Sequence, residues 1–336
     1  MKTLKYLLTL AFVGGMMVAC DTDVENIEIQ KPYTYSDLYY QNLRDFKASD
    51  HEISFMWFAQ WSGQNSMAVR FTGLPDSLDL CSIWGGGIPP KENTQLWEDL
   101  RFTQKVKGTK MLYVAIVRLG AEDDSHDFKK VLNEGLDMPE GEAREAKLKE
   151  AIDMYAYYYL DQVFENDLDG FDADYEPDGD FLSGKYFTMF IQKLGEYMGP
   201  NPNQSKEERL KLIQERYGKD VTDTNKLLCI DVYGRDADKE CEPYINYYLI
   251  QNYGGGTPSL RRDFPAEKHV FCVNWGDDWP TDGTKLYNQA RWEPATGRKG
   301  GFGAFYGQRD YFVHEYNPEP YHRFRECIQI QNPAVY

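Results

Sequence analysis

The chain lacks the features of several common protein classes. It has 37 lysines and arginines against 54 aspartates and glutamates, so its formal net charge at pH 7 is −17. Because like charges repel, this balance argues against nucleic acids and anionic lipid surfaces as partners. It contains no HExxH motif, and its five histidines are scattered along the chain. No GxSxG elbow is present, and no glycine-rich phosphate fingerprint follows the first apolar run, so neither a serine hydrolase nor a nucleotide site is indicated. We therefore expect neither a metal nor a cofactor.

Cysteines are few and carry no motif. Apart from Cys20, five remain, an odd number, and none are spaced CxxC. Cys81, Cys229 and Cys272 lie inside apolar, strand-like runs, which predicts buried small hydrophobic side chains. The pattern supports neither a disulfide framework nor a zinc site.

The first 20 residues carry an export signal. Lys2 and Lys5 precede an apolar run over 7–18 that is too short to span a bilayer. The run ends in MVAC, which resembles a bacterial lipobox with Cys20 as the lipidated residue. The alternative is an ordinary signal peptide with an incidental cysteine. We predict a signal peptide over 1–20, a tether and lead-in over 21–48, and a single domain over 49–336, anchored by lipid in the cell envelope and exposed at its outer surface.

Short apolar runs alternate with polar or helical segments in the rest of the chain. Continuous apolar runs are typical of parallel strands that are covered on both faces. The predicted strands are 53–61, 77–85, 110–120, 168–176, 226–234, 246–254, 269–276 and 301–307, and the clearest helices are 141–166, 187–198 and 321–330. Eight strands alternating with helices predict an α/β fold, a (β/α)8 TIM barrel, with a doubly wound open sheet as the alternative. The fifth and sixth strands are so close in sequence that the helix between them must be short or degenerate.

One stretch, LDGFDADYEPDGD (168–180), holds six carboxylates. An EF-hand loop beginning at Asp174 would need a bidentate glutamate at position 185, which is a lysine, so calcium is disfavoured. In a strand, side chains alternate between faces, so Asp172, Asp174 and Glu176 point the same way. Three ionised carboxylates on one face repel each other, and we expect them to retain a proton near neutral pH. This arrangement suits Glu176 as a general acid at the carboxyl end of the fourth strand, where barrel enzymes place their chemistry.

The other three acids of this stretch are expected to have lesser roles. Asp169, at the start of the strand, is expected to be structural. Asp178 and Asp180 follow Pro177 into a loop, where they are expected to be solvated.

DGFDADYE (169–176) resembles the DGxDxDxE signature of glycoside hydrolase family 18, the family of chitinases and endo-β-N-acetylglucosaminidases. The resemblance implies substrate-assisted catalysis, in which the substrate's own 2-acetamido oxygen attacks the anomeric carbon and forms an oxazolinium intermediate. Carried over, Glu176 would protonate the leaving oxygen and later activate water. Asp174 would orient the acetamido group, and Asp172 would keep the pair in the right protonation state.

Three features favour the endo-β-N-acetylglucosaminidase branch of that family. Gln251 and Tyr253 share a face at the end of the sixth strand, as in the similar endo-β-N-acetylglucosaminidases, and Gly254 stands where chitinases more often carry aspartate. The eighth strand ends without the tryptophan typical of chitinases, so Phe305 or Tyr306 would floor the sugar site. Only about 25 residues separate the seventh and eighth strands, too few for an inserted subdomain.

Aromatic residues make up 15% of the chain, including 25 tyrosines and 7 tryptophans, and several follow predicted strands where they could stack on sugars. A large aromatic core is the alternative use for them. The predicted substrate-binding residues are Gln251, Tyr253, Tyr233, Trp84, Asn274, Trp275 and Tyr306, and further candidates are Trp57, Trp61 and Trp279.

The sequence thus predicts a monomeric endo-β-N-acetylglucosaminidase that cleaves the GlcNAc-β1,4-GlcNAc core of N-glycans on glycoproteins. A chitinase-like hydrolase of chito-oligosaccharides and a non-catalytic glycan-binding lipoprotein on the same barrel are the alternatives.

Overall fold

The computed structural model describes residues 33–63 and 66–333. The predicted signal peptide, its Cys20 and residues 21–32 of the predicted tether lie outside the described residues, so the lipid anchor stays a prediction. Within the described residues, no helix combines the length and apolar character needed to cross a membrane.

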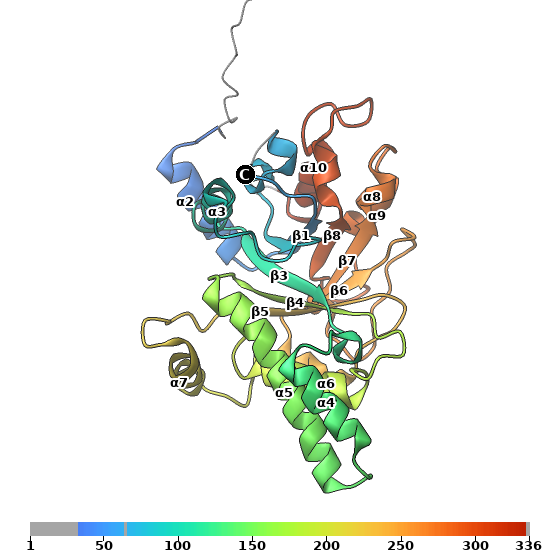
Figure 1. Ribbon diagram of the computed structural model, residues 1–336. Helices are drawn as coiled ribbons and strands as arrows, with labels where there is room; N and C mark the ends of the chain where they lie inside the picture. Colours follow the sequence, from blue (N-terminus) through green and yellow to red (C-terminus); the bar gives the residue numbers. More distant parts are fainter. Residues whose placement is uncertain (1–32, 64–65, 334–336) are drawn as a thin grey trace, which may run out of the picture. The chain divides into compact units, whose positions relative to one another are not determined.

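The eight predicted strands are all present and close into a parallel barrel in sequence order (Figure 1). The closing pair joins the last strand to the first, with Phe55 opposite Gly303. This finding confirms the (β/α)8 barrel and excludes the open sheet. The strands are β1 (Ile53–Phe58), β2 (Leu80–Ile83), β3 (Lys110–Ile116), β4 (Gly170–Tyr175), β5 (Leu227–Val232), β6 (Tyr247–Gln251), β7 (His269–Asn274) and β8 (Gly301–Phe305).

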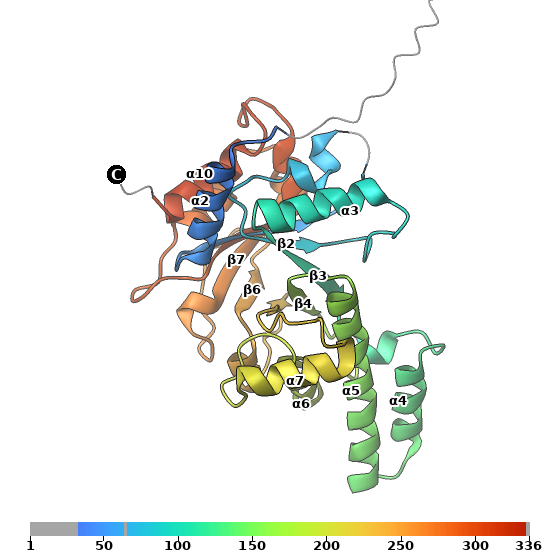
Figure 2. The ribbon, with the colours of Figure 1, turned by 90° about the vertical axis from the view of Figure 1, so that its left-hand side faces the viewer.

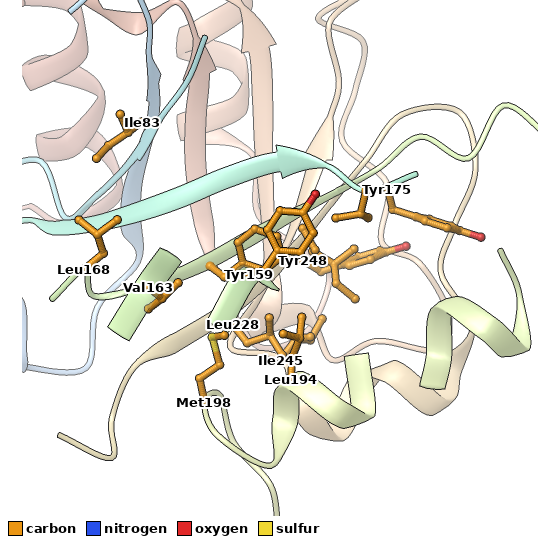
Figure 3. Close-up of a cluster of buried hydrophobic side chains, with 14 of the residues drawn as sticks. Ile83, Tyr159, Val163, Leu168, Tyr175, Leu194, Met198, Leu228, Ile245 and Tyr248 are labelled. Carbon is orange, nitrogen blue, oxygen red and sulfur yellow. The ribbon is translucent and has the colours of Figure 1, made fainter. Parts of the chain in front are cut away.

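Side chains alternate between the inside of the barrel and its helical coat. On β4, Asp172 and Asp174 point inward, whereas Phe171, Ala173 and Tyr175 pack outward against the helices. Figure 3 shows part of this outer core, where side chains of the helices meet those of the strands. The predicted division of the acidic strand into two faces is therefore confirmed.

Three predicted helices are present, as α5 (Glu142–Glu165), α6 (Lys185–Gly195) and α10 (His322–Gln331). α5 buries Leu148, Ile152, Tyr155, Tyr159 and Val163, a row at helical spacing, against the barrel and its neighbouring helices. Figure 2 shows α5 lying beside α4. Helices not predicted are α2 (Asp37–Ala48), α3 (Thr94–Arg101), α4 (Asp127–Asp137), α7 (Lys206–Tyr217), α8 (Trp275–Asp278) and α9 (Thr284–Arg291).

The connection between β5 and β6 carries only a 3-10 turn, Lys239–Tyr244, within the described residues. Pro243 lies inside it and has no backbone N–H to continue a helical ladder. The expected degenerate helix at this position is confirmed.

The cysteines behave as predicted in the described part of the chain. Cys81, Cys229 and Cys272 are buried and free, and so are Cys241 and Cys327. Cys229 and Cys272 belong to the core inside the barrel, whereas Cys81 belongs to the core under the helices.

Candidate active site

The acidic strand is held at its entrance by a required glycine. A Cβ added to Gly170 would lie 2.2 Å from the backbone oxygen of Leu227, so only glycine permits the pairing of β4 with β5 at that point. β4 then runs through the barrel and ends at Tyr175, and Glu176 follows directly. Glu176 is therefore at the carboxyl-end mouth of the barrel, as predicted.

A cleft of about 130 Å³ opens at this mouth. Its walls combine two carboxyl groups, one amide and a set of aromatic rings, all from strand ends. The lining residues are Trp57, Trp84, Ile116, Asp174, Glu176, Gln251, Tyr253 and Phe305. A larger hollow, of about 710 Å³, is lined by His51, Asp79 and Asp169, which precede β1, β2 and β4 at the opposite end of the barrel. Barrel enzymes work at the carboxyl ends of their strands, so the smaller cleft is the candidate site.

Asp172 lies fully buried inside the barrel, below the cleft. Its Oδ2 accepts hydrogen bonds from Trp57 Nε1 at 3.0 Å and from Ser82 Oγ at 2.7 Å. Burial raises the pKa of Asp172 to about 6, against the opposing effect of these donors. Side chains of β1 and β2, which pair with each other but not with β4, thus hold the innermost carboxyl group of the row from across the barrel interior.

Asp174 is the middle acid and is almost completely buried. Gln251 Nε2 donates to its Oδ1 at 3.3 Å and also donates to Oδ1 of Asp231 on β5. Burial raises the pKa of Asp174 to about 7, and the charges of Glu176 and Asp172 act in the same direction. Burial therefore disfavours the ionised form of both buried members of the row.

Glu176 is the most accessible of the three acids, with its side chain 28% exposed. Arg118, which follows β3, donates from Nε to the backbone oxygen of Glu176, and its Nη2 lies 3.7 Å from Glu176 Oε2. The guanidinium group also contacts Asp178 Oδ2 at 3.3 Å. The contacts of the Arg118 guanidinium group thus fix the backbone at the end of β4, and the Glu176 carboxyl group faces the cleft.

The aromatic wall of the cleft centres on Phe305. The rings of Tyr253 and Trp84 lie 5.7 Å and 5.8 Å from it, and that of Trp57 lies 6.3 Å away. Tyr233 is 58% exposed and lies 5.9 Å from Tyr253, at the outer edge. Apolar walls with a few convergent polar groups are the usual form of a carbohydrate or small-ligand site. The structure thus brings together four predicted substrate-binding residues and selects Phe305 at the end of β8.

Besides Tyr233, which lies at the outer edge, three predicted substrate-binding residues do not line the cleft. Trp275 is fully buried in the core, with the Arg323 guanidinium carbon 4.5 Å from its ring, so it cannot form part of an exposed sugar platform. Asn274, the last residue of β7, donates to Oδ2 of Asp277 in the adjoining helix α8 at 2.8 Å. Tyr306 adopts a left-handed backbone with φ of 54° just after β8, and its ring packs edge-on against Phe305. The further candidates Trp61 and Trp279 pack partly buried against the outer core.

The remaining acids of the 168–180 stretch are divided between two roles. Asp169 accepts from the backbone N–H of Met111 at 2.9 Å and from Gln104 at 2.7 Å, which is the structural role expected of it. Asp178 is 83% exposed in its side chain, as expected. The expectation for Asp180 is wrong, because its Oδ1 accepts from the backbone N–H groups of Gly120 and Leu182 and ties two loops together. Asp174 points into the barrel while Asp178 is exposed, so they do not share a calcium loop.

Comparison with known proteins identifies the family that this geometry represents. The family model described as glycoside hydrolase family 18, BT1044-like, matches residues 19–263. The chain belongs to this family. It is therefore a glycoside hydrolase, and the resemblance found in the acidic strand is confirmed.

Individual relatives include proteins that bear the name endo-β-N-acetylglucosaminidase. Endo-β-N-acetylglucosaminidase F2 of Elizabethkingia meningoseptica is 26% identical over 378 residues, covering 99% of this chain and all of that protein. A solved BT1044 variant superimposes with a TM-score of 0.66 at 22% identity, covering 88% of this chain and 93% of the other. A double mutant of the endo-β-N-acetylglucosaminidase of Cordyceps militaris, in complex with fucosyl-N-acetylglucosamine-Asn, has a TM-score of 0.58 at 19% identity, covering 90% and 98%. These two structures share the fold with this chain.

Three polar residues of the site were missed from the sequence, Ser82, Arg118 and Asp231, and so was the apolar lining residue Ile116. Asp231 interrupts the apolar run LLCIDV on β5, and a lone acid in a buried strand is the signal that could have found it. Ser82 and Arg118 carry no comparable signal, because a serine within a strand and an arginine after one are common.

Proposed function

We propose that this glycoside hydrolase is an endo-β-N-acetylglucosaminidase that cleaves the GlcNAc-β1,4-GlcNAc core of N-glycans. The observation that carries the proposal is the meeting of Glu176, Asp174, Gln251 and Tyr253 in one cleft at the carboxyl ends of β4 and β6. The relative in Elizabethkingia meningoseptica bears the name of that activity. One GlcNAc would stay on the protein, and the rest of the oligosaccharide would be released.

The reaction would retain configuration through substrate assistance. Glu176, the accessible acid, would protonate the glycosidic oxygen as that bond breaks. The acetamido oxygen of the substrate would attack the anomeric carbon in its place, and the ring so formed would carry positive charge near its nitrogen. Asp174, fixed by Gln251, would stabilise that charge from beneath, and the Tyr253 hydroxyl would hydrogen-bond the attacking oxygen. Water activated by the Glu176 carboxylate would then open the ring.

Mass spectrometry of glycans released from high-mannose, hybrid and complex glycoproteins tests the proposal. We expect release of oligosaccharides that lack one core GlcNAc, with that sugar left on the asparagine. Glu176→Gln should lower turnover by at least 10²-fold, because the proton donor is gone, and Asp174→Asn should also slow it severely. Glu140→Gln, an exposed loop position, is the matched control and should retain turnover.

Two other outcomes would replace the proposal. Cleavage of chitotetraose without any release from glycoproteins would assign a chitinase-like hydrolase. Measurable glycan affinity without hydrolysis at high protein concentration would assign a non-catalytic binding protein.

We also propose that the enzyme is lipid-anchored in the bacterial cell envelope through Cys20, with its barrel exposed at the outer surface. The support is the run 7–18 followed by MVAC. Cys20→Ala should prevent lipid attachment and move the protein from the membrane pellet to the soluble fraction, whereas Cys327→Ala should not. Equal amounts of wild type and Cys20→Ala in the pellet would contradict the anchor.

A further inference from the structure

Asp231 is a fourth carboxyl group in the floor of the site. It lies on β5 directly opposite Asp174 of β4 in the strand register. Its side chain is completely buried, deeper than Asp174 and as deep as Asp172. Ionising an aspartate at such a buried position costs free energy of folding unless a cation or several hydrogen-bond donors compensate the charge.

The hydrogen bonds around Asp231 leave room for one proton. Oδ1 accepts from Gln251 Nε2, the same amide that contacts Asp174. The Asp231 carboxyl group also lies within hydrogen-bonding reach of both Asp174 and Asp172. Oδ2 of Asp231 and Oδ1 of Asp172 are buried, and no N–H or O–H group of the described residues donates to either. Neighbouring carboxyl groups with oxygens that lack another donor are satisfied when one of the groups is protonated.

The electrostatic surroundings favour Asp231 as the holder of that proton. Burial raises its pKa well above the ordinary range, and the charges of Asp174 and Asp172 raise it further. Cys229 on β5, Cys272 on β7 and Tyr253 just after β6 also face the cluster, and burial together with the charges of the aspartates raises the pKa of each. Of the charged groups in the loops above, Glu176 raises the pKa of Asp174 and Arg118 lowers it.

We propose that Asp231 is a positioning residue that holds a proton and shares it by hydrogen bonds with Asp174 and Asp172. Its role in catalysis rests on the proposed function. The Asp231 O–H donates toward the other two carboxyl groups while its carbonyl oxygen accepts from Gln251. Asp174 can then remain anionic beneath the acetamido nitrogen as positive charge develops there. Asp231 neither gains nor loses a proton during turnover. Asp172 and Asp174 therefore have a neutral carboxyl group beside them throughout the reaction.

Two variants of Asp231 separate a proton donor from a space-filling side chain. Asp231→Asn keeps a donor and an acceptor in the same plane, so kcat should fall less than tenfold. Asp231→Leu has a similar size but neither group, so kcat should fall by more than 100-fold while KM changes less than threefold. A fall in kcat for Asp231→Asn as large as that for Asp231→Leu would overturn the proposal. Equal changes in kcat and KM for Asp231→Leu would also overturn it, since they would indicate a general loss of site structure.

Infrared spectroscopy of the free protein tests the proton itself. At pH 9, where Asp174 and Glu52 with pKa values of about 7 are ionised, the wild type should show an absorption in the carbonyl-stretch region of protonated carboxylic acids, and Asp231→Asn should lose most of it. Persistence of the full band in Asp231→Asn would overturn the proposal. This measurement needs no substrate, so it gives its answer even if no glycan is released and the proposed function fails.

Discussion

At the scale of single residues, the site is defined by carboxyl groups placed where they destabilise the fold. Asp172, Asp174 and Asp231 are all buried inside the barrel, and burial raises the pKa of each. A core residue chosen for packing alone would be apolar. The free energy lost by burying these acids is therefore best understood as a requirement of the chemistry.

This cost predicts a pH-dependent gain in stability for Asp174→Asn. The pKa of Asp174 is about 7 in the folded protein, against 3.8 for a solvated aspartate. The raised pKa of Asp174 therefore contributes stability that is fully present below about pH 4. This contribution is lost as the pH rises through 7, because the folded state must give up a tightly held proton. Asparagine cannot ionise, so the variant should be more stable than wild type at pH 8, by about 1–3 kcal/mol, and gain nothing at pH 4.

Urea unfolding at the two pH values measures this difference. Asp220→Asn, at an exposed position, is the control and should shift neither value by more than about 0.5 kcal/mol. An equal gain at pH 4 and pH 8 for Asp174→Asn would show that packing, rather than ionisation, controls its stability.

At the scale of elements, the strands were predictable because their apolar runs are nearly continuous, as expected of parallel strands covered on both faces. Several helices were not, because they are short or polar. α7 is such a case: its sequence KEERLKLIQERY buries only Arg209 and Ile213. Its start is nevertheless marked by a capping box between Ser205 and Glu208, which is readable as SxxE in the sequence. Helix starts of this kind are a better guide here than apolar periodicity.

Contacts between elements explain which parts of the site could be foreseen. Asp172, Asp174 and Glu176 follow from one strand and its alternation, and Gln251 and Tyr253 came from the family resemblance. Asp231 lies beside Asp174 only because of the strand stagger that closes the barrel, which no single segment encodes. Trp275 was misplaced for a local reason: it starts the short helix α8, which was not predicted, and its ring is buried in the core.

At the scale of the whole barrel, closure brings together residues from opposite ends of the described chain. Lys299, just before β8, is completely buried, and its Nζ lies 2.7 Å from Glu52 Oε2, just before β1, and 2.8 Å from Glu293 Oε1. Nζ also donates to the backbone oxygen of Ala290 at 3.0 Å. This ion pair sits where the last strand meets the first, so it connects the two edges that closure must join.

Removing one partner of this pair should destabilise the barrel strongly. Lys299→Met leaves Glu52 buried without its cation, and burial already raises the pKa of Glu52 to about 7. Breaking a buried pair in this way typically costs about 3–5 kcal/mol, so we expect a loss of that size in guanidinium unfolding at pH 8. The double variant Lys299→Met with Glu52→Gln leaves no buried unpaired charge at this seam, because the remaining partner Glu293 is half-exposed and solvated, and should recover more than half of the loss. Losses that simply add in the double variant would show that the two groups stabilise the fold independently, and that barrel closure does not depend on their pairing.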